Sequence, residues 1–509
     1  MSNIVVIPTA GLGSRMGELT QFLNKALLPY KGKPVLAHII DQFPNDTNFI
    51  IPVGYKSDQI IDFCALVYPE KNIEFVHIPN YTESFTGPGY TIKQCLDNIN
   101  GSFYYIPCDT YFNEGLPLEH DEDTYYVKKV DTNMNYHYTT FNVDNGRLVD
   151  YKFKEYTTDN YYAFTGVMYI KDHIAFKNRL LSLSGPEIIY TIELNSNVNH
   201  LYSWIDFGNL EEYKAACNKS QKYDFTKTDE ITYLCNNKVV KYWKADNIAH
   251  KKFVKHKTNI EVYPSNTKQL NNWLCYDYFE GDTLYNHNNY ASFPLLMQWL
   301  DNKVWIKSQV DLRADAHDFY KVKTLDRVYK FVNKHKNLPT PTHVNDVPVK
   351  DYRYYLGNIN WEMLYSDLLA GYTHGDLQFD NLIISTDKTF RVIDWRHEFG
   401  TNVEYGDIYY DLAKLYGGFI IDYSKIKQNS FEVREQDSKI YLDIPNINDY
   451  NFYTSQLINY IRYKRYNEYK VRLLVPIIFW NMAPLHHEPF DKFLWYLGMM
   501  MFEEAFKHG

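Results

Sequence analysis

Short apolar runs alternate with helix-like stretches through the first half of this chain. Buried strands are expected at residues 4–7, 49–54, 75–78 and 103–106, and a helix is expected over residues 58–67. Strands that alternate with helices favour an α/β fold with a doubly wound, mostly parallel sheet. Because such sheets bind ligands beyond the carboxyl ends of their strands, the turns after the first and last of these runs are candidate binding sites.

The pattern changes near residue 218, where a helix-like segment gives way to a polar stretch. Short β-like runs follow between residues 231 and 279, and longer helical segments dominate after them. A chain of 509 residues exceeds what one hydrophobic core usually supports. We therefore predict two domains, residues 1–222 and residues 223–509, of which the second combines a small β-rich lobe with a larger helical lobe.

The composition argues against several classes of protein. A formal net charge of −9 is unlike that of a nucleic-acid-binding protein, which usually carries a basic face. The six cysteines are scattered without a C-x-x-C pair, so neither a disulfide framework nor a zinc knuckle is expected. The sequence shows no signal peptide and no apolar stretch long enough to span a bilayer. We expect a cytoplasmic protein without membrane insertion, and association of identical chains is left open.

A glycine-rich turn follows the first apolar run, where residues 10–16 read AGLGSRM. Glycines in such a turn let backbone N–H groups approach phosphate oxygens closely. The spacing of Gly11, Gly13 and Gly17 fits neither the dinucleotide fingerprint G-x-G-x-x-G nor the P-loop. The turn therefore predicts a phosphate site of another kind.

The turn and the next segment, NKALLP at residues 24–29, resemble the signature of sugar-phosphate nucleotidylyltransferases. That signature reads roughly G-x-G-S/T-R-M/L and continues as P-K-A/P-L-L-P. Asn24 stands in place of the usual proline, a departure that the cytidylyltransferases for phosphocholine share. Further matches occur in order over about the first 215 residues: KGKPVL at 31–36, GPG at 87–89, FTGVMY at 164–169 and WIDFGNLEEY at 204–213.

This resemblance implies a Rossmann-like nucleotidyltransferase domain in which a substrate phosphate attacks the α-phosphorus of a nucleoside triphosphate. It also implies the nucleotide-side residues, namely Gly11, Gly13, Ser14 and Gly87 for binding and Arg15 and Lys25 for neutralising the triphosphate. Asp109 and Asp206 are the implied ligands of Mg²⁺. Lys154, or its neighbour Lys152, and Gly166 are expected on the side of the incoming phosphate, although the family's E-K-P is missing there.

A second motif lies in the other half, where residues 374–381 read HGDLQFDN and Asp394 follows an apolar run. An aspartate with an asparagine five residues later has the spacing of a kinase catalytic loop. The glycine at position 375 makes the motif similar to the aminoglycoside-phosphotransferase and choline-kinase group. The resemblance implies a bilobal, protein-kinase-like α+β domain that uses ATP, with Asp376 orienting the acceptor hydroxyl and Asn381 and Asp394 binding Mg²⁺.

The ATP-covering half of this second site is less complete. Lys241 is the preferred candidate for the lysine on the α- and β-phosphates, with Lys238 and Lys244 as alternatives. The segment around Tyr278 resembles the hinge that binds adenine. No clear glycine-rich loop precedes Lys241, and the helix expected over residues 246–257 contains no glutamate to pair with it.

Together, the motifs predict a bifunctional enzyme with ATP and CTP, or another NTP, as substrates. The kinase would phosphorylate a small alcohol or sugar, and the nucleotidylyltransferase would convert the product into an NDP-activated building block, for example for a surface polysaccharide. An amino alcohol such as choline is an alternative acceptor, for which Trp395 and Trp480 are candidates for an aromatic cage. A nucleotide-binding regulatory protein with one inactive domain is a second alternative.

Overall fold

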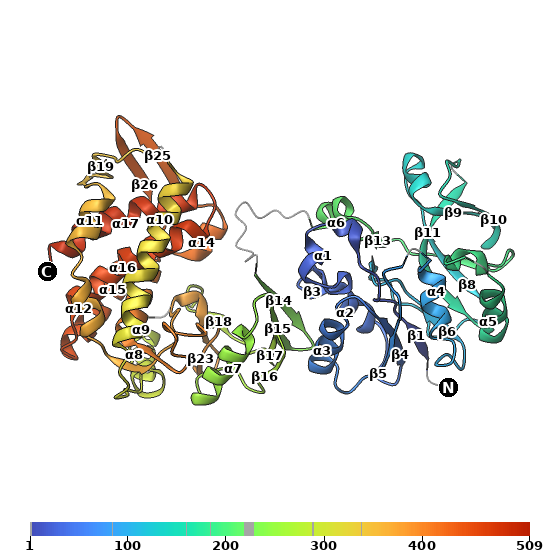
Figure 1. Ribbon diagram of the computed structural model, residues 1–509, viewed down its shortest axis with the longest axis horizontal. Coiled ribbons are helices and arrows are strands. Elements are labelled where there is room, and N and C mark those ends of the chain that lie inside the picture. The colour runs from blue at the N-terminus through green and yellow to red at the C-terminus, as the bar shows by residue number, and fades with distance from the viewer. Residues whose placement is uncertain are drawn as a thin grey trace. The chain divides into compact units, whose positions relative to one another are not determined.

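The computed structural model describes residues 3–83, 85–158, 160–183, 185–217, 229–287, 290–336 and 338–509. These residues belong to two compact units, which are drawn from blue to red along the chain in Figure 1. The first unit comprises Met1–Lys219 and Asp229–Lys244, and the second consists mainly of Ala245–Gly509. The predicted boundary at residue 222 lies outside the described residues, so the division at 222 stays a prediction.

A nine-stranded sheet runs through the described part of the first unit. Its strands, in spatial order, are β5 (Asn72–His77), β4 (Asn48–Val53), β1 (Ile4–Val6), β6 (Phe103–Tyr105), β11 (Tyr161–Ile170), β8 (Thr124–Lys128), β12 (Asn197–His200), β10 (Arg147–Phe153) and β9 (Thr139–Asp144). The four strands expected from the sequence are confirmed, and they are parallel to one another. Beyond them the sheet is mixed rather than mostly parallel, because β11 runs antiparallel to both β6 and β8.

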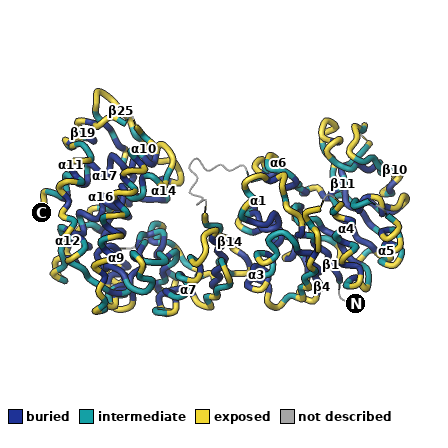
Figure 2. Tube along the Cα trace, in the orientation of Figure 1, coloured by how far each residue is buried: buried dark blue, intermediate teal, exposed yellow. Residues whose placement is uncertain are grey.

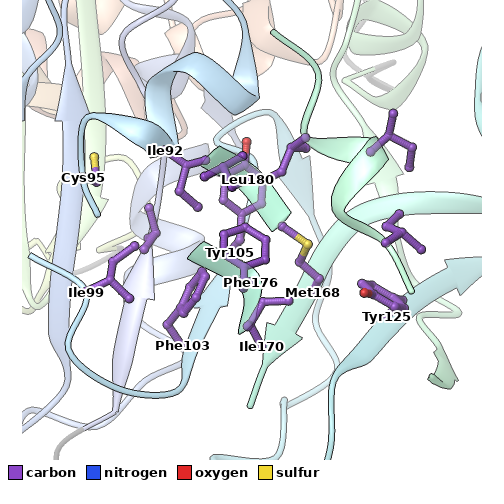
Figure 3. Close-up of a cluster of buried hydrophobic side chains, with 14 of the residues drawn as sticks. Ile92, Cys95, Ile99, Phe103, Tyr105, Tyr125, Met168, Ile170, Phe176 and Leu180 are labelled. Atoms are coloured by element: carbon purple, nitrogen blue, oxygen red, sulfur yellow. The ribbon is translucent and has the colours of Figure 1, made fainter. Parts of the chain in front are cut away.

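Helices connect the strands in the described part of the first unit. They are α1 (Leu19–Phe22), α2 (Val35–Ile40), α3 (Ser57–Val67), α4 (Pro88–Lys93), α5 (His173–Ser182) and α6 (Leu210–Ala216). Helix α3 confirms the helix expected over residues 58–67. Figure 3 shows side chains of α4 and α5, including Ile92 and Phe176, packed over Phe103 of β6 and Met168 of β11. This buried cluster fixes the strands whose carboxyl ends carry the predicted site.

A hairpin of β14 (Glu230–Cys235) and β15 (Lys238–Trp243) also belongs to the first unit, although the sequence places it in the second domain. Its side chains form hydrogen bonds with earlier residues of the same unit. The Tyr233 hydroxyl donates to the carbonyl oxygen of Leu27, and Lys238 Nζ donates to that of Leu66 at 3.1 Å. These bonds explain why the hairpin forms one compact body with residues that precede it by about 170 to 200 positions.

The second unit is rich in helices, as the sequence predicts. They are α7 (Ile248–Thr258), α8 (Ser292–Trp299), α9 (Arg313–His317), α10 (Lys323–Lys334), α11 (Tyr352–Asn358), α12 (Trp361–Ser366), α13 (Ile408–Ile420), α14 (Tyr423–Lys427), α15 (Tyr450–Tyr463), α16 (Glu468–Met482) and α17 (Phe490–Phe506). In Figure 2 the buried segments of this unit run through α16 and α17. These two helices pack along each other and form the centre of the helical core.

Short strands complete the second unit. They are β16 (Lys268–Leu270), β17 (Trp273–Asp277), β18 (Asp282–Thr283), β19 (His343–Val344), β20 (Val347–Pro348), β21 (Ala370–Tyr372), β22 (Leu382–Ile384), β23 (Phe390–Val392), β24 (Tyr405–Asp407), β25 (Glu432–Gln436) and β26 (Lys439–Asp443). Strands β22 and β23 form a hairpin that frames the second predicted motif. In neither unit does a described helix combine the length and the apolar character that crossing a membrane requires.

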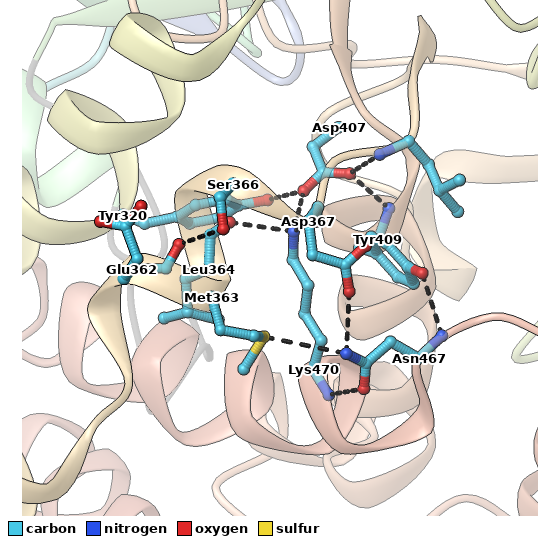
Figure 4. Close-up of polar contacts among 11 residues, drawn as sticks. Tyr320, Glu362, Met363, Leu364, Ser366, Asp367, Asp407, Tyr409, Asn467 and Lys470 are labelled. Atoms are coloured by element: carbon cyan, nitrogen blue, oxygen red, sulfur yellow. Dashed lines mark hydrogen bonds and ion pairs between the residues drawn. The ribbon is translucent and has the colours of Figure 1, made fainter.

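A buried ion pair anchors helix α13, whose residues contact the second motif (Figure 4). The Asp407 carboxylate caps the helix by accepting the backbone N–H of Tyr409 at 3.2 Å. The same carboxylate accepts hydrogen bonds from Lys470 Nζ at 2.7 Å and from the Tyr320 hydroxyl at 2.8 Å. The Asp407 and Lys470 side chains are both fully buried. A buried charge pair with this many partners fixes the start of α13 firmly.

Candidate active sites

The glycine-rich turn lies at the carboxyl end of β1 and leaves backbone open to a ligand. Gly13 adopts a left-handed conformation with φ 65°, which a side chain would strain, and its carbonyl accepts the Thr20 hydroxyl at 3.0 Å. A Cβ added at Gly11 would meet no atom within 4 Å. Ser14 and Arg15, which follow, are exposed. The predicted nucleotide side of the site is therefore an open turn beside an exposed cation, an arrangement suited to phosphate.

Lys25 and Asp109 meet at the edge of the sheet, as their predicted roles require. Lys25 Nζ donates to Asp109 Oδ2 at 2.6 Å and to the carbonyl oxygen of Gly208 at 3.3 Å. Burial raises the pKa of Asp109, but the positive charges of Lys25 and Arg15 outweigh this effect, so the pKa lies below its usual value. Asp109 is therefore a carboxylate, next to a cation that is 8% exposed.

Asp206 is brought to the same place by a short pair of strands, β7 (Thr110–Tyr111) and β13 (Ile205–Asp206). The backbone N–H of Phe207 donates to the carbonyl oxygen of Asp109 at 2.8 Å. Burial, together with the negative charges of Asp109 and Glu212, raises the pKa of Asp206 to about 7. Two carboxylates that repel each other fit a divalent cation, because such an ion neutralises both and prefers oxygen ligands.

These two carboxylates would need further oxygen ligands from a substrate to complete the coordination of Mg²⁺. Within the described ranges, no group of three or more His, Cys, Asp or Glu side chains is arranged to hold a metal ion. A site with two protein carboxylates is the arrangement expected where phosphates supply the remaining ligands.

Asn24 has a structural role at the position where proline is usual. Its side-chain amide donates to the carbonyl oxygens of Thr9 at 3.1 Å and Tyr55 at 2.7 Å. Its Oδ1 accepts the N–H of Ala26 at 2.9 Å and so caps the 3-10 turn Lys25–Leu27. Asn24 thus ties two neighbouring segments together beside Lys25 by hydrogen bonds, which proline could not make.

The two glycines expected near the base and the sugar both allow close packing. A Cβ at Gly87 would lie 2.9 Å from the carbonyl oxygen of Pro186. Gly166 has φ 81°, and a Cβ there would lie 2.6 Å from a ring carbon of Pro107. A larger residue at either position would displace its neighbour, and the predicted ligand contacts of both glycines stay predictions.

Lys154 lies on the surface just beyond β10, and its ammonium is 5.3 Å from the ring centroid of Phe153. Its backbone N–H donates to the carbonyl oxygen of Tyr138 at 3.1 Å. Lys152 forms a partly exposed ion pair with Asp150 at 3.5 Å. Among the residues described, neither lysine forms an ion pair with Asp109 or Asp206, so their role on the incoming phosphate stays a prediction.

A hollow beside Asp206 was not expected from the sequence. It has a volume of about 530 Å³ and is lined by Lys128, Lys129, Val130, Asp131, Thr132, Met134 and Tyr138. The Tyr138 hydroxyl donates to Glu212 at 3.1 Å, and Lys128 Nζ donates to the carbonyl oxygen of Trp204 at 2.7 Å. Since Trp204 directly precedes the strand of Asp206, this hollow is a candidate for the acceptor side of the site.

In the second unit, Asp376 is paired with a cation that the sequence analysis missed. Lys414 Nζ of α13 lies 2.6 Å from Asp376 Oδ1, and the Lys414 side chain is largely buried. Burial raises the pKa of Asp376, but the charges of Lys414 and Arg396 outweigh this effect and lower the pKa to about 2. Lys414 follows Asp411 by three positions on the same helix, and that spacing is the only signal of its location in the sequence.

The backbone around Asp376 is fixed by two buried side chains. Asp411 accepts the N–H groups of His374 at 2.8 Å and Gly375 at 2.7 Å, and the indole N–H of Trp305 at 3.1 Å. His374 Nδ1 accepts the N–H of Asp376 at 3.2 Å, and its Nε2 bonds the carbonyl oxygen of Ile393 at 2.8 Å. Burial lowers the pKa of His374 to about 4, so the ring is neutral and holds the loop in place.

The two predicted metal ligands flank the β22–β23 hairpin. Asn381 precedes β22, and its side-chain amide donates to the carbonyl oxygen of Asp376 at 2.8 Å. The backbone N–H of Ile393 donates to the carbonyl oxygen of Asn381 at 3.0 Å, which brings the next residue, Asp394, to the same end of the hairpin. Asp394 has φ 59°, an uncommon conformation that is tolerated best by Asp and Asn.

Of the predicted ATP-covering residues, Lys241 lies on β15 and Tyr278 lies directly after β17. Lys241 Nζ is buried and lies 2.9 Å from Glu230 on the neighbouring strand, so a strand residue supplies the carboxylate that the following helix lacks. Of the two alternative lysines, Lys238 bonds the Leu66 carbonyl oxygen and Lys244 lies 4.9 Å from the ring centroid of Phe22. Tyr278 directly follows β17 and is exposed. Nucleotide contacts of Lys241 and Tyr278 stay predictions.

The aromatic cage considered for an amino alcohol is not formed by the two tryptophans. Trp395 is 1% exposed and donates from its indole to the carbonyl oxygen of Lys252 at 2.9 Å. Trp480 is fully buried and stacks on Trp495, with 4.7 Å between ring centroids. Both rings are buried in the core, so neither is available to line a ligand cage.

Comparison with known proteins agrees with the geometry of the first site. Residues 5–116 match the MobA-like NTP transferase domain. The first unit contains a nucleotidyltransferase domain. The match includes the glycine-rich turn, Lys25 and Asp109, and ends before β8, so the comparison concerns the first strands of the sheet.

Several curated proteins are similar to this part of the chain. "Bifunctional protein GlmU" of Methanococcus vannielii is 30% identical over 142 residues, which cover 28% of this chain and 33% of that protein. "UTP--glucose-1-phosphate uridylyltransferase AglF" of Haloferax volcanii is 28% identical over 113 residues, covering 22% of this chain and 45% of that protein. The chain thus spans about a third of the length of GlmU and less than half of AglF.

Solved structures of low similarity include a UDP-glucose pyrophosphorylase complexed with UDP-glucose, at 16% identity and a TM-score of 0.37. The match covers 43% of this chain and 98% of that one. CTP:phosphocholine cytidylyltransferase from Streptococcus pneumoniae is 17% identical, with a TM-score of 0.35, and the match covers 43% of this chain and 99% of that one.

Proposed function

We propose that this chain is a bifunctional enzyme. The second unit phosphorylates a small alcohol or sugar with ATP. The first unit then joins the phosphorylated product to CTP or another NTP and releases pyrophosphate. The product is an NDP-activated building block, of the kind consumed in the synthesis of surface polysaccharides.

The observation that carries the first activity is the convergence of Lys25, Asp109 and Asp206 beside the open glycine turn. In this proposal Arg15 and Lys25 neutralise the triphosphate while an oxygen of the acceptor phosphate attacks the α-phosphorus and pyrophosphate leaves. Asp109 and Asp206 would hold Mg²⁺, which supplies charge neutralisation at the reacting phosphates. The hollow lined by Lys128 and Tyr138 is the proposed acceptor site.

The observation that carries the second activity is the fixed loop that presents Asp376 between Lys414 and the β22–β23 hairpin. Asp376 would accept the hydrogen bond of the acceptor hydroxyl and orient its oxygen toward the γ-phosphorus of ATP. Asn381 and Asp394 would bind Mg²⁺ on the ATP phosphates. Phosphoryl transfer needs mainly positioning and charge neutralisation, and this arrangement supplies both.

One incubation tests both activities. The full chain is mixed with ATP, CTP, UTP, GTP, Mg²⁺ and a panel of sugars, polyols and amino alcohols that includes choline and ethanolamine. Pyrophosphate release is followed in solution, and phosphorylated and nucleotide-linked products are identified by mass spectrometry. Nucleotide binding without turnover for either step would instead support the reading in which one domain only binds nucleotide.

A further inference from the structure

Basic side chains from three elements gather beside Asp376 in the second unit. Lys323 and Arg327 lie four positions apart on α10 and therefore on one face of that helix. Arg396 follows the β23 strand, and its Nε donates to the carbonyl oxygen of Gly375, next to Asp376, at 3.1 Å. Lys414 comes from α13. We call Lys323, Arg327 and Arg396 the cationic cluster.

Lys323 and Arg396 lie against the same two aromatic rings, so these two side chains are close together. The Lys323 ammonium lies 3.0 Å from the ring centroid of Phe319 and 5.8 Å from that of Tyr410. The Arg396 guanidinium lies 5.3 Å and 5.8 Å from the same two centroids. Two basic side chains therefore face the same pair of rings, and the π faces offset only part of the repulsion that arises when both are charged.

The negative charge available to these cations is small. Lys414 is paired with Asp376, whereas Lys323, Arg327 and Arg396 form no ion pair with any residue that the structure describes. Asp326, the acidic neighbour on α10, is paired with Lys330 at 2.7 Å on the exposed side. Burial and the charges of Arg396, Arg327 and Lys414 lower the pKa of Lys323 well below its usual value. An anion bound at the cluster would relieve this repulsion.

We propose that the cationic cluster binds an anionic group, a carboxylate or a phosphate, on the acceptor alcohol that the second unit phosphorylates. The inference rests on the proposed kinase function and narrows its acceptor to a hydroxy acid or a phosphorylated sugar or polyol. A quaternary ammonium acceptor is disfavoured, because Lys414 and Arg396 next to Asp376, together with the basic side chains clustered with Arg396, would repel it.

The cluster places the acceptor relative to the reacting atoms. With its anionic group on Lys323 and Arg327, the acceptor directs a hydroxyl toward Asp376, next to Arg396. The hydroxyl oxygen forms a bond to the γ-phosphorus, the bond from that phosphorus to the β,γ-bridging oxygen breaks, and ADP leaves with the electron pair. The hydroxyl proton passes to the Asp376 carboxylate and from there to solvent.

Four small acceptors test the proposal with the full chain, ATP and Mg²⁺: glycerate, glycerol 3-phosphate, glycerol and choline. ADP formation is expected with kcat/KM at least about tenfold higher for an acidic acceptor than for glycerol or choline, a difference typical of one charge-assisted contact. Glycerate and glycerol 3-phosphate separate a carboxylate site from a phosphate site. Equal or better use of choline or glycerol would overturn the inference while leaving the kinase assignment intact.

Variants of the cationic cluster test which residues bind the anionic group of the acceptor. Lys323→Met and Arg327→Gln are each expected to raise KM for the acidic acceptor about tenfold or more and to leave KM for ATP unchanged. Lys330→Met, on the exposed side of the same helix, is the matched control and should behave like the parent protein. A rise in KM for ATP instead would assign the cluster to the ATP phosphates and contradict the proposal.

Binding of inorganic phosphate tests the proposed anion site even if the protein phosphorylates none of the four acceptors. Titration calorimetry on the full chain should show a phosphate site that the Lys323→Met, Arg327→Gln double variant loses and Lys330→Met keeps. Equal phosphate binding by all three proteins would overturn the inference. Absence of any turnover, together with loss of phosphate binding in the double variant, would contradict the kinase function but retain the anion site. Circular dichroism checks that each variant is folded.

Discussion

Lys414 pairs with Asp376 at 2.6 Å, although 38 positions separate the two residues in the sequence. The helix that carries Lys414 also carries Asp411, which accepts hydrogen bonds from the backbone of the same loop. One buried helix thus fixes both the backbone and the carboxylate of the proposed acceptor-orienting residue. The capping carboxylate of Asp407 in turn fixes the start of that helix.

Removing this cation should impair the kinase step through the position of Asp376. For Lys414→Met we expect kcat for acceptor phosphorylation to fall about a hundredfold, because the carboxylate loses its charge-assisted partner. Lys414→Arg should recover part of the rate, which a purely structural loss would not allow. Lys427→Met, which removes a half-exposed partner of Asp380, is the control. An unchanged rate in a folded Lys414→Met protein would contradict a positioning role.

Loss of Asp376 should separate the two activities. We expect Asp376→Ala to abolish phosphorylation of the free acceptor and to leave nucleotidylyl transfer to a pre-phosphorylated acceptor intact, because the two motifs lie in separate compact units. The rates of ADP and pyrophosphate formation measure the two steps independently. If both activities disappear from a folded variant, the assignment of one step to each unit is wrong.

The converse variants act on the first unit. Lys25→Ala and Asp109→Ala should each lower pyrophosphate release about a hundredfold or more while phosphorylated acceptor accumulates, because each removes a charge next to the reacting phosphates. Mg²⁺-dependent pyrophosphate release is the measurement, and Lys33→Ala, on an ion pair nearer the surface, is the control. Near-normal release by a folded Asp109→Ala protein would remove this aspartate from the site.

Several residues predicted for the first site carry local signals in the sequence, and their roles stay predictions. Gly13 needs a conformation that only glycine adopts freely, and Asp109 lies in the turn after a buried strand, so both positions have local signals in the sequence. Hydrogen bonding of Asn24 to Thr9 and Tyr55 could not be read in this way, since it depends on contacts 15 and 31 positions away.

The second site is harder to predict, because its residues also depend on contacts that are distant in the sequence. The Asp376 loop has a recognisable spacing, but its partner Lys414 and the carboxylate that pairs with Lys241 come from other elements. The carboxylate that pairs with Lys241 is not on the helix after it, because Glu230 lies on the preceding strand. Trp480 is a candidate ligand-binding residue in the sequence, yet tertiary packing buries it. Composition alone cannot distinguish a ligand-binding tryptophan from a buried one.

The buried pair of Asp407 and Lys470 should make the second unit sensitive to the loss of either partner. Lys470→Met leaves a buried carboxylate without its cation, so we expect a loss of about 3–5 kcal/mol in the free energy of unfolding. Lys330→Met removes an exposed ion pair and should change the stability by less than about 1 kcal/mol. Thermal unfolding followed by circular dichroism measures both. Similar midpoints for the two variants would show that the buried pair does not anchor α13.

A buried lysine on α7 should make the stability depend on pH. Burial lowers the pKa of Lys255 to about 7, whereas its usual value in an unfolded chain is 10.5. Between these values the unfolded chain binds a proton that the folded chain does not, so stability rises with pH across this window. The full effect is about 1.4 kcal/mol per pH unit. Lys255→Met removes the titrating group and should abolish this contribution.

The measurement is the difference in melting temperature between the parent protein and Lys255→Met at pH 7, 8 and 9. Because other groups titrate equally in both proteins, the difference isolates Lys255. We expect the parent protein to gain stability relative to the variant as the pH rises. Lys257→Met, an exposed position on the same helix, should show no such trend against the parent. Parallel curves for the parent and Lys255→Met would mean that Lys255 keeps an ordinary pKa in the folded protein, through closer interaction with Asp411 than its burial allows.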